Sequence, residues 1–279
     1  FDLVVVGPEA PLVAGLADDL RAAGVRVFGP GAAAARIEGS KSYAKDVMVR
    51  AGIPTAHAQT FTDVEAALAF LRRFGAPCVV KADGLAAGKG VRVCENLIEA
   101  ADAVDESLRQ RVFGDAGATI VIEECLTGEE ISVFALSDGR TVIPLAAAQD
   151  HKRIGDGDTG PNTGGMGAYS PLPDLDGAMV EHLLDTIHRP ILAEMARRGT
   201  PFRGCLYAGL MLTVDGPALL ECNVRLGDPE AQVILPRIAS PLGPILLAAA
   251  RGRLPDGGPS VVPTIPGAAV GIVLAAEGY

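Results

Sequence analysis

The first 28 residues constrain the fold most, because a strand pattern, a helical pattern and a second strand pattern follow one another directly. Residues 3–6 and 25–28 are the apolar strand patterns, and residues 11–23 place leucine and valine on one helical face. A strand, a helix and a strand in this order predict a parallel sheet. The turn at residues 7–9 lies where open α/β sheets bind ligands, although an ordinary strand-to-helix turn has the same spacing.

Two capped helices are expected next. Ser40 is the predicted N-cap of a helix over residues 40–50. Thr62, with Glu65 three residues later, predicts a capping box for a helix that ends at Gly75.

A different pattern begins at Pro77, where short strands follow one another through turns. We expect strands over residues 78–81, 91–94, 119–125, 131–137 and 141–147, with a helix near 97–110. Successive, turn-linked strands are typical of an antiparallel α+β lobe.

The remainder of the chain is expected to hold a long loop, helices and a hairpin. Residues 150–173 are rich in Gly, Asp, Thr, Asn and Pro, which predicts one long loop of a kind that is usually functional or disordered. The further elements expected are helices over 174–199, 231–238 and 242–251, a hairpin of strands 205–214 and 218–224, and a strand over 269–275.

These patterns predict an α/β and α+β protein of several parts, since 279 residues exceed the usual single domain of about 100 to 200. We divide it into an N-terminal βαβ portion with a linker helix (1–60), a small lobe (61–127), a large lobe (128–262) and the start of a C-terminal domain (263–279). The strand patterns at both ends lack flanking turns, so we expect the native chain to extend further.

The charge and the cysteines exclude several classes of protein. A net charge of -10 gives no general attraction to nucleic acid or anionic lipid. The five cysteines are odd in number and lack CxxC spacing, which predicts reduced, buried thiols and a cytoplasmic protein. No apolar stretch is long enough to span a membrane.

Two glycine-rich or acidic segments are candidate nucleotide contacts. In residues 79–91, V-V-K-A-D-G-L-A-A-G-K-G-V, Lys81 ends a strand and small residues up to Gly90 allow backbone N–H groups to approach phosphates. A glycine-rich hairpin without a ligand has the same pattern. In residues 120–130, I-V-I-E-E-C-L-T-G-E-E, a strand end could bind an adenine edge while Glu130 binds ribose hydroxyls, or the acids could form a solvated turn.

The segment A-L-L-E-C-N-V-R-L-G-D-P-E, residues 218–230, is a candidate metal strand. Side chains alternate along a strand, so Glu221 and Asn223 share one face and Cys222 lies on the other. Carboxylate and amide oxygens suit magnesium, and Arg225 could bind an anion through two hydrogen bonds. A polar strand end without metal remains the alternative.

The loop at residues 149–169, Q-D-H-K-R-I-G-D-G-D-T-G-P-N-T-G-G-M-G-A-Y, brings charge to the end of an apolar strand. Its glycines permit close backbone approach to a small ligand. His151 could act as a general base, but a loop histidine of this kind more often only forms hydrogen bonds.

In this order the segments resemble the ATP-grasp superfamily, in which two α+β lobes hold ATP with a lysine from each lobe, a glycine-rich loop and a Glu-x-Asn metal strand. Within it the chain is similar to the phosphoribosylamine-glycine ligase family. The motifs that carry this similarity are G-P-E-A-P-L (7–12), E-G-S-K (38–41), K-A-D-G-L-A-A-G-K-G (81–90), Q-D-H-K-R (149–153), D-T-G-P-N-T-G-G-M-G-A-Y-S-P (158–171) and G-D-P-E (227–230).

The resemblance implies that ATP drives ligation of glycine to 5-phosphoribosylamine through glycyl phosphate, in purine synthesis and with Mg²⁺ or Mn²⁺. It implies ATP contacts for Lys41, Lys81, Gly88, Lys89, Gly90, Glu123, Glu124, Leu126 and Glu130, and metal ligation by Glu221 and Asn223. It implies substrate contacts for Glu9, Asp150, Asp158, Gly164, Gly165, Arg225, Gly227 and Asp228, with Lys152, Arg225 and Asp228 as catalytic candidates.

The alternatives are another ATP-grasp ligase of purine synthesis, which the Gly-Gly-Met-Gly loop disfavours, and a nucleotide-binding module without turnover. We expect small-molecule substrates, no nucleic-acid or membrane partner, and a monomer or weak homodimer. Residues 207–211 lack the second metal carboxylate that many ATP-grasp enzymes carry on this strand, which leaves the number of metal ions open.

Overall fold

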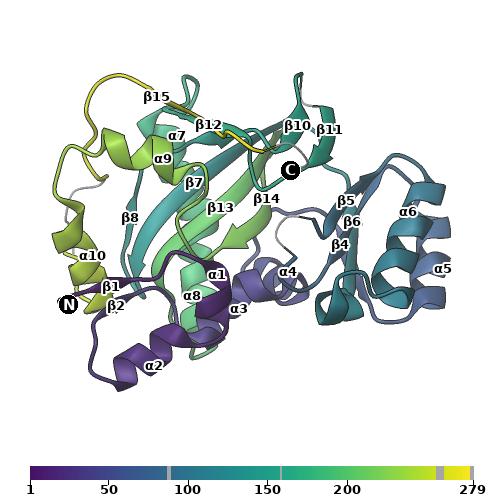
Figure 1. Ribbon diagram of the computed structural model, residues 1–279, viewed down its shortest axis with the longest axis horizontal. Coiled ribbons are helices and arrows are strands. Elements are labelled where there is room, and N and C mark those ends of the chain that lie inside the picture. Colours follow the sequence, from purple (N-terminus) through teal and green to yellow (C-terminus); the bar gives the residue numbers. More distant parts are fainter. Residues whose placement is uncertain (87–88, 158, 256–260, 277–279) are drawn as a thin grey trace.

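The computed structural model describes residues 1–86, 89–157, 159–255 and 261–276. Figure 1 shows an N-terminal region, a small lobe with its own helices, and a large lobe built on a central sheet. Each lobe contains a four-stranded sheet whose neighbouring strands are antiparallel, as the turn-linked strand patterns predicted.

The N-terminal region has the predicted parallel strand pair. β1 (Val4–Val5) pairs with β2 (Val27–Phe28). The single helix expected between them is wrong, because the chain forms α1 (Glu9–Val13) and α2 (Leu16–Ala22) with a break at Gly15. Gly15 has a φ of 95°, a left-handed conformation that glycine adopts at little cost and that interrupts the helix.

Two more helices lead into the small lobe. After α3 (Ala32–Gly39), α4 (Lys41–Arg50) begins as predicted at Ser40, whose hydroxyl accepts a hydrogen bond from the Tyr43 N–H.

The capping box predicted at Thr62 is wrong. Asp63 is the N-cap of α5 (Val64–Phe74), and its carboxylate accepts a hydrogen bond from the Ala66 N–H at 2.8 Å. Thr and Asp are both good N-caps, so the sequence pattern does not distinguish adjacent positions.

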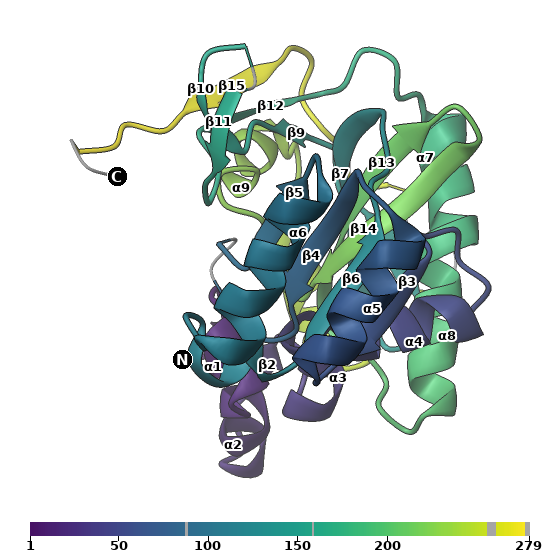
Figure 2. The ribbon, with the colours of Figure 1, turned by 90° about the vertical axis from the view of Figure 1, so that its right-hand side faces the viewer.

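The small lobe has the strand order β3-β6-β4-β5. Its strands are β3 (Ala58–Phe61), β4 (Cys78–Ala82), β5 (Val91–Cys94) and β6 (Ile120–Glu124). Helices α5 and α6 (Leu97–Val104) cover one face, as Figure 2 shows, and the chain continues through the helical turns Asp105–Arg109 and Gly114–Ala118. Val80 and Ile122 pack under these helices, whereas their neighbours Lys81 and Glu123 lie on the opposite face.

The large lobe has the strand order β14-β13-β7-β8. Its strands are β7 (Glu129–Asp138), β8 (Val142–Pro144), β13 (Arg203–Thr213) and β14 (Gly216–Asn223). Val133 and Leu206 belong to a core that includes α7 (Gly177–Leu183), the turn Leu184–His188 and α8 (Arg189–Arg197). The alternate residues Phe134 and Tyr207 belong to a second core with α9 (Ala231–Ile234) and α10 (Leu242–Ala250), and the turn Leu235–Arg237 follows α9.

The expectation of one irregular loop over residues 150–173 is wrong. Four short strands occupy it: β9 (Gln149–Asp150), β10 (Arg153–Gly155), β11 (Thr159–Asn162) and β12 (Gly167–Ser170). β10 pairs with β11, and β12 pairs with β9. Such short strands are held by backbone pairing, which a composition of Gly, Thr, Asn and Pro does not reveal.

The final strand, β15 (Ala269–Ile272), pairs antiparallel with β12 of the large lobe. The predicted strand is therefore present, shorter than expected. The division into parts at residues 60, 127 and 262 stays a prediction.

All five cysteines are free thiols, as expected, and Cys78, Cys94, Cys205 and Cys222 are buried. The expectation of burial is wrong for Cys125, which is partly exposed at the end of β6. In the described part of the chain, no helix has both the length and the apolar character to cross a membrane.

Candidate active site

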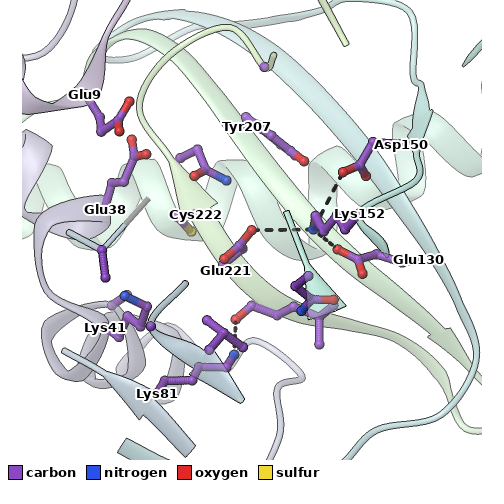
Figure 3. A pocket seen from close by; sticks show the side chains of 18 of the residues that line it. Glu9, Glu38, Lys41, Lys81, Glu130, Asp150, Lys152, Tyr207, Glu221 and Cys222 are labelled. Carbon is purple, nitrogen blue, oxygen red and sulfur yellow. Dashed lines mark hydrogen bonds and ion pairs between the residues drawn. The ribbon is translucent and has the colours of Figure 1, made fainter. Parts of the chain in front are cut away.

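A cavity of about 850 Å³ is lined by residues of both lobes and of the N-terminal region. Figure 3 shows side chains of these elements pointing toward one another across it. Sixteen predicted site residues line the cavity: Glu9, Lys41, Lys81, Gly90, Glu123, Glu124, Leu126, Glu130, Asp150, Lys152, Gly164, Glu221, Asn223, Arg225, Gly227 and Asp228. Segments far apart in the sequence thus meet at one site.

Two lysines of different elements share one buried carboxylate. Lys81 of β4 pairs with Glu123 of β6, which is 1% exposed. Lys45 of α4 lies 2.8 Å from the other oxygen of Glu123, without the angular geometry of a hydrogen bond. The Lys81 ammonium also donates to the Leu220 carbonyl of β14 at 3.5 Å, which brings it to the large lobe.

Lys45 has further polar partners. Its ammonium donates to Thr55 Oγ1 at 2.7 Å and to the Ala56 carbonyl at 3.2 Å. Thr55 Oγ1 donates in turn to the Leu219 carbonyl at 2.6 Å. Burial lowers the pKa of Lys45, and Glu123 opposes that shift. These contacts connect α4 and both lobes at the wall of the cavity.

Lys41 is positioned by the end of β4. The Lys41 N–H donates to the Asp83 carbonyl at 2.9 Å, and the Ser40 hydroxyl donates to the Asp83 carboxylate at 3.0 Å. The Lys41 ammonium donates to the Gly84 carbonyl at 2.9 Å. Burial lowers the pKa of Lys41, while Glu221 raises it. A cation is therefore fixed beside the glycine-rich segment, where a phosphate could bind.

Glu221 and Asn223 are alternate residues of β14 and both line the cavity. Cys222 between them also borders the cavity, but it is 3% exposed and packs in the core. Burial raises the pKa of Glu221, but Lys152, Lys81 and Lys41 outweigh burial and hold that pKa below its usual value. Glu221 is therefore a charged oxygen donor beside the lysines.

The fit of these residues to a metal ion follows from their donor set. Among the described residues, no group of three or more His, Cys, Asp or Glu could hold a metal by itself. Magnesium commonly takes one or two protein oxygens and completes its coordination with substrate phosphates and water. The carboxylate of Glu221 and the amide oxygen of Asn223 fit that kind of binding.

Lys152 is the centre of an acidic cluster, which Figure 3 shows beside Glu221. Its ammonium pairs with Glu130, lies 3.7 Å from Glu221 Oε1 and lies 4.0 Å from Asp150 Oδ2. Burial lowers the pKa of Lys152, but the surrounding carboxylates raise it well above its ordinary value. Burial also raises the pKa values of Glu130 and Asp150, and Lys152 opposes both shifts. The adenosine role of Glu130 stays a prediction, since its observed partner is Lys152.

Arg225 connects β14 to the N-terminal region. Its Nε atom lies 2.7 Å from Glu9 Oε2 and 3.7 Å from Glu38 Oε1. Glu38 also accepts a hydrogen bond from the Val224 N–H at 2.7 Å. Burial raises the pKa of Glu38 to about 7, although Arg225 opposes this shift. The N-terminal region thus supplies two carboxylates that orient the guanidinium at the cavity.

The predicted substrate loop contacts the G-D-P-E turn. Gly165 has a φ of 119°, and a Cβ on it would lie 2.4 Å from Pro229 Cδ, so the approach requires glycine. The Thr163 hydroxyl donates to the Lys152 carbonyl at 2.8 Å. These contacts hold the loop against both the turn and the segment that carries Lys152.

Four predicted site residues are not among those that line the cavity, and two of these four are not described by the structure. Lys89 and Gly165 are not among the lining residues, although their chain neighbours Gly90 and Gly164 are, and Gly88 and Asp158 lie outside the described residues. Sequence reasoning missed the cavity residues Glu38, Lys45, Tyr207 and Glu230. Glu38 and Glu230 are in motifs we singled out, E-G-S-K and G-D-P-E, but nothing in the sequence shows their partners.

The two lobes and the cavity between them define an ATP-grasp fold. Biotin carboxylase from Campylobacter jejuni, solved as a β-γ-ATP complex, shares this fold with a TM-score of 0.75 at 22% identity, over 96% of this chain and 58% of that chain. Two family models for phosphoribosylglycinamide synthetase together match residues 1–231. The N-domain model matches residues 1–38, and the ATP-grasp (A) domain model matches residues 39–231. The chain belongs to the phosphoribosylglycinamide synthetase family.

Individual relatives agree with the family match. Phosphoribosylamine–glycine ligase of Rhizobium meliloti (strain 1021) is 59% identical over 254 residues, covering 91% of this chain and 60% of that relative. The Brucella melitensis protein of the same name is 55% identical, covering 100% of this chain and 64% of the relative. The crystal structure of the Thermotoga maritima phosphoribosylamine–glycine ligase superposes with a TM-score of 0.81 at 38% identity, covering 91% of this chain and 63% of that one. The chain therefore spans less than two thirds of the length of these relatives.

Proposed function

We propose that this chain carries the ATP site and the glycine-activating centre of a phosphoribosylamine–glycine ligase. The reaction joins glycine to 5-phosphoribosylamine in de novo purine biosynthesis and gives glycinamide ribonucleotide, ADP and phosphate. The observation that carries the proposal is the meeting of Lys41, Lys81, Glu221 and Arg225 at one cavity, in a chain whose relatives bear this name.

In the first step a glycine carboxylate oxygen attacks the γ-phosphorus of ATP, the bond to the β-phosphate oxygen breaks, and ADP leaves. Lys41 and Lys81 bind the phosphates, together with backbone groups of the glycine-rich segment that ends at Lys89-Gly90. Phosphoryl transfer depends mainly on positioning and charge neutralisation, so these side chains need no nucleophile among them.

In the second step the phosphoribosylamine nitrogen attacks the carbonyl carbon of glycyl phosphate, phosphate leaves, and the nitrogen loses a proton. Arg225 and Lys152 bind the developing and departing anions, and Asp228 is the remaining catalytic candidate. Arg225 forms paired hydrogen bonds with such anions, whereas Lys152 acts as a point charge.

Glu221 and Asn223 would hold Mg²⁺ or Mn²⁺, which supplies charge neutralisation at the ATP phosphates when bound. Adenosine binds along Glu123, Glu124 and Leu126, with Glu130 at the ribose. The two substrates are contacted by Glu9, Asp150, Asp158, Gly164, Gly165 and Gly227. Gly88 contacts ATP.

We also propose a cytoplasmic enzyme that is a monomer or weak homodimer. Five free cysteines, four of them buried, support a reducing compartment. Sedimentation at micromolar concentration measures the oligomeric state.

The test is ADP release from ATP with glycine, in the presence and absence of phosphoribosylamine. The proposal requires that sustained ADP release depends on glycine and rises with phosphoribosylamine. ADP release that depends on another carboxylate would indicate a different ATP-grasp ligase. ATP binding without ADP release under any of these conditions would indicate a nucleotide-binding module.

A further inference from the structure

Three buried carboxylate oxygens of cavity-lining residues have no hydrogen-bond partner within the described part of the chain. One of them, Glu123 Oε2, lies 2.8 Å from the Lys45 ammonium and is charge-paired, whereas the other two are in no such pair among the described residues. These two are Glu230 Oε2 and Asp150 Oδ1. Both residues line the cavity, and Glu230 is 2% and Asp150 9% exposed. A buried carboxylate oxygen without a donor is costly, so this arrangement indicates a ligand that brings donors with it.

The orientation of Glu230 is fixed by residues of the large sheet. The Tyr207 hydroxyl donates to Glu230 Oε1 at 2.7 Å, and the Ser132 hydroxyl, whose single proton can serve only one acceptor, lies 3.4 Å from the same oxygen. Ser132 and Tyr207 also lie in hydrogen-bond contact at 2.9 Å. A Cβ on Gly227 would lie 2.2 Å from Glu230 Oε2, so the absence of a side chain there makes room for the carboxylate. One oxygen is thus used by the protein, and the other is left for a ligand.

The local charge calls for a cation. The nearby ammonium of Lys152 pairs with Glu130, lies 3.7 Å from Glu221 and reaches Asp150 only at 4.0 Å. Its interactions are therefore divided among three carboxylates, and Glu230 adds a fourth. An ammonium, with three N–H donors, matches two unpartnered oxygens and one further acceptor.

We propose that Glu230 and Asp150 bind the ammonium group of glycine, and that Tyr207 and Ser132 are positioning residues for Glu230. This inference rests on the proposed function. The ammonium of glycine is two bonds from its carboxylate carbon, so binding at Glu230 and Asp150 directs the carboxylate toward Lys152. An amine held as an ammonium has no lone pair to attack, so the site also prevents bound glycine from competing with phosphoribosylamine for the acyl phosphate.

The test compares glycine with glycolate, which replaces the ammonium by a neutral hydroxyl. Binding of each is measured by calorimetry to the full protein loaded with magnesium and a non-hydrolysable ATP analogue. Glu230→Gln preserves the shape and the acceptor for Tyr207 but removes the charge. We expect glycine affinity to fall about 10- to 100-fold, since hydrogen bonds to charged groups are of that strength, while glycolate affinity changes less than about twofold. Tyr207→Phe should reduce glycine affinity by a smaller factor.

A matched control is Glu194→Gln, which removes another buried carboxylate. Glu194 is 6% exposed and pairs with Arg197 and Arg198 at 2.7 Å, away from the cavity residues. The Glu194→Gln variant should have a lower melting temperature but unchanged affinities for glycine and glycolate.

Unchanged glycine affinity in Glu230→Gln would overturn this inference alone, as would an equal loss for glycine and glycolate, which would show a structural role. A wild-type protein that binds the ATP analogue but not glycine would overturn the proposed function as well.

Discussion

Replacing Lys45 by methionine removes the cation that joins α4, the small lobe and the segment beside β14. Lys45 is 9% exposed and loses three contacts on substitution: Glu123 Oε2 at 2.8 Å, Thr55 Oγ1 at 2.7 Å and the Ala56 carbonyl at 3.2 Å. Removing one partner of a buried ion pair costs about 3 to 5 kcal/mol. Because Glu123 keeps Lys81 as a partner, we expect the lower end, about 3 kcal/mol.

This loss is large enough to measure by thermal unfolding. For a protein of this size, each 1 kcal/mol shifts the melting temperature by roughly 2 to 4 °C, which gives a decrease of about 6 to 12 °C. The control is Arg50→Met on the same helix, where the side chain is 60% exposed and pairs with Asp46 at 2.9 Å. That surface pair should contribute less than about 1 kcal/mol.

A double variant tests whether the pair itself is responsible. The unfolding free energy lost in Lys45→Met with Glu123→Gln should be smaller than the sum of the two single losses by at least about 1 kcal/mol. A Lys45→Met melting temperature as high as that of Arg50→Met would refute the assignment of a structural ion pair.

Three further predictions follow from single positions. Lys81→Met should weaken ATP binding about 10- to 100-fold in calorimetry and affect glycine less, because it removes a charge aimed at phosphate; unchanged ATP affinity would exclude Lys81 from the site. Gly165→Ala should destabilise the protein by about 1 to 3 kcal/mol and raise the KM for glycine, because a methyl group meets Pro229 at a φ of 119°; wild-type values of both would show that the loop does not pack as described. Burial lowers the pKa of His188 from 6.5 to about 4, so below pH 6.5 the unfolded state takes up a proton that the folded state does not. The unfolding free energy should therefore be unaffected by His188 above pH 6.5 and should drop by about 3 kcal/mol as the pH falls to 4, and this drop should be absent in His188→Gln.

The sequence predicted those parts of the fold that depend on local pattern. Strand alternation gave the hairpin of β13 and β14, and with it the placement of Glu221 and Asn223 on one side of the strand. The position of Ser40 gave the start of α4. Where a local rule allows neighbouring answers, as for Thr62 and Asp63, the prediction was wrong by one residue. Gly15 showed a similar limit, because glycine is tolerated within helices and the sequence does not show that it adopts a left-handed conformation here.

The candidate site was predictable in its residues but not in its contacts. Motifs located Lys81 and Arg225, whereas their partners Glu123 and Glu38 lie 42 and 187 residues away in the chain and meet them only after folding. Lys45 illustrates the difficulty best. From the sequence alone, Lys45 would be expected on the exposed face of its helix, as most lysines are. It is buried because α4 packs against β6, where Glu123 pairs with it.

The central claim is that Glu221 and Asn223 hold the metal that neutralises the ATP phosphates during glycine activation. The measurement is a magnesium titration of glycine-dependent ADP production in the full-length enzyme, made for each variant alongside its melting temperature. Glu221→Gln should keep the fold while metal-dependent activity falls steeply, and Asn223→Ala should act in the same direction but less, because it removes a neutral ligand. Cys222→Ala, whose sulfur lies in the core, should lower the melting temperature and leave the magnesium dependence as in wild type. An unaltered magnesium dependence in Glu221→Gln, or an equal loss in Cys222→Ala, would contradict the account.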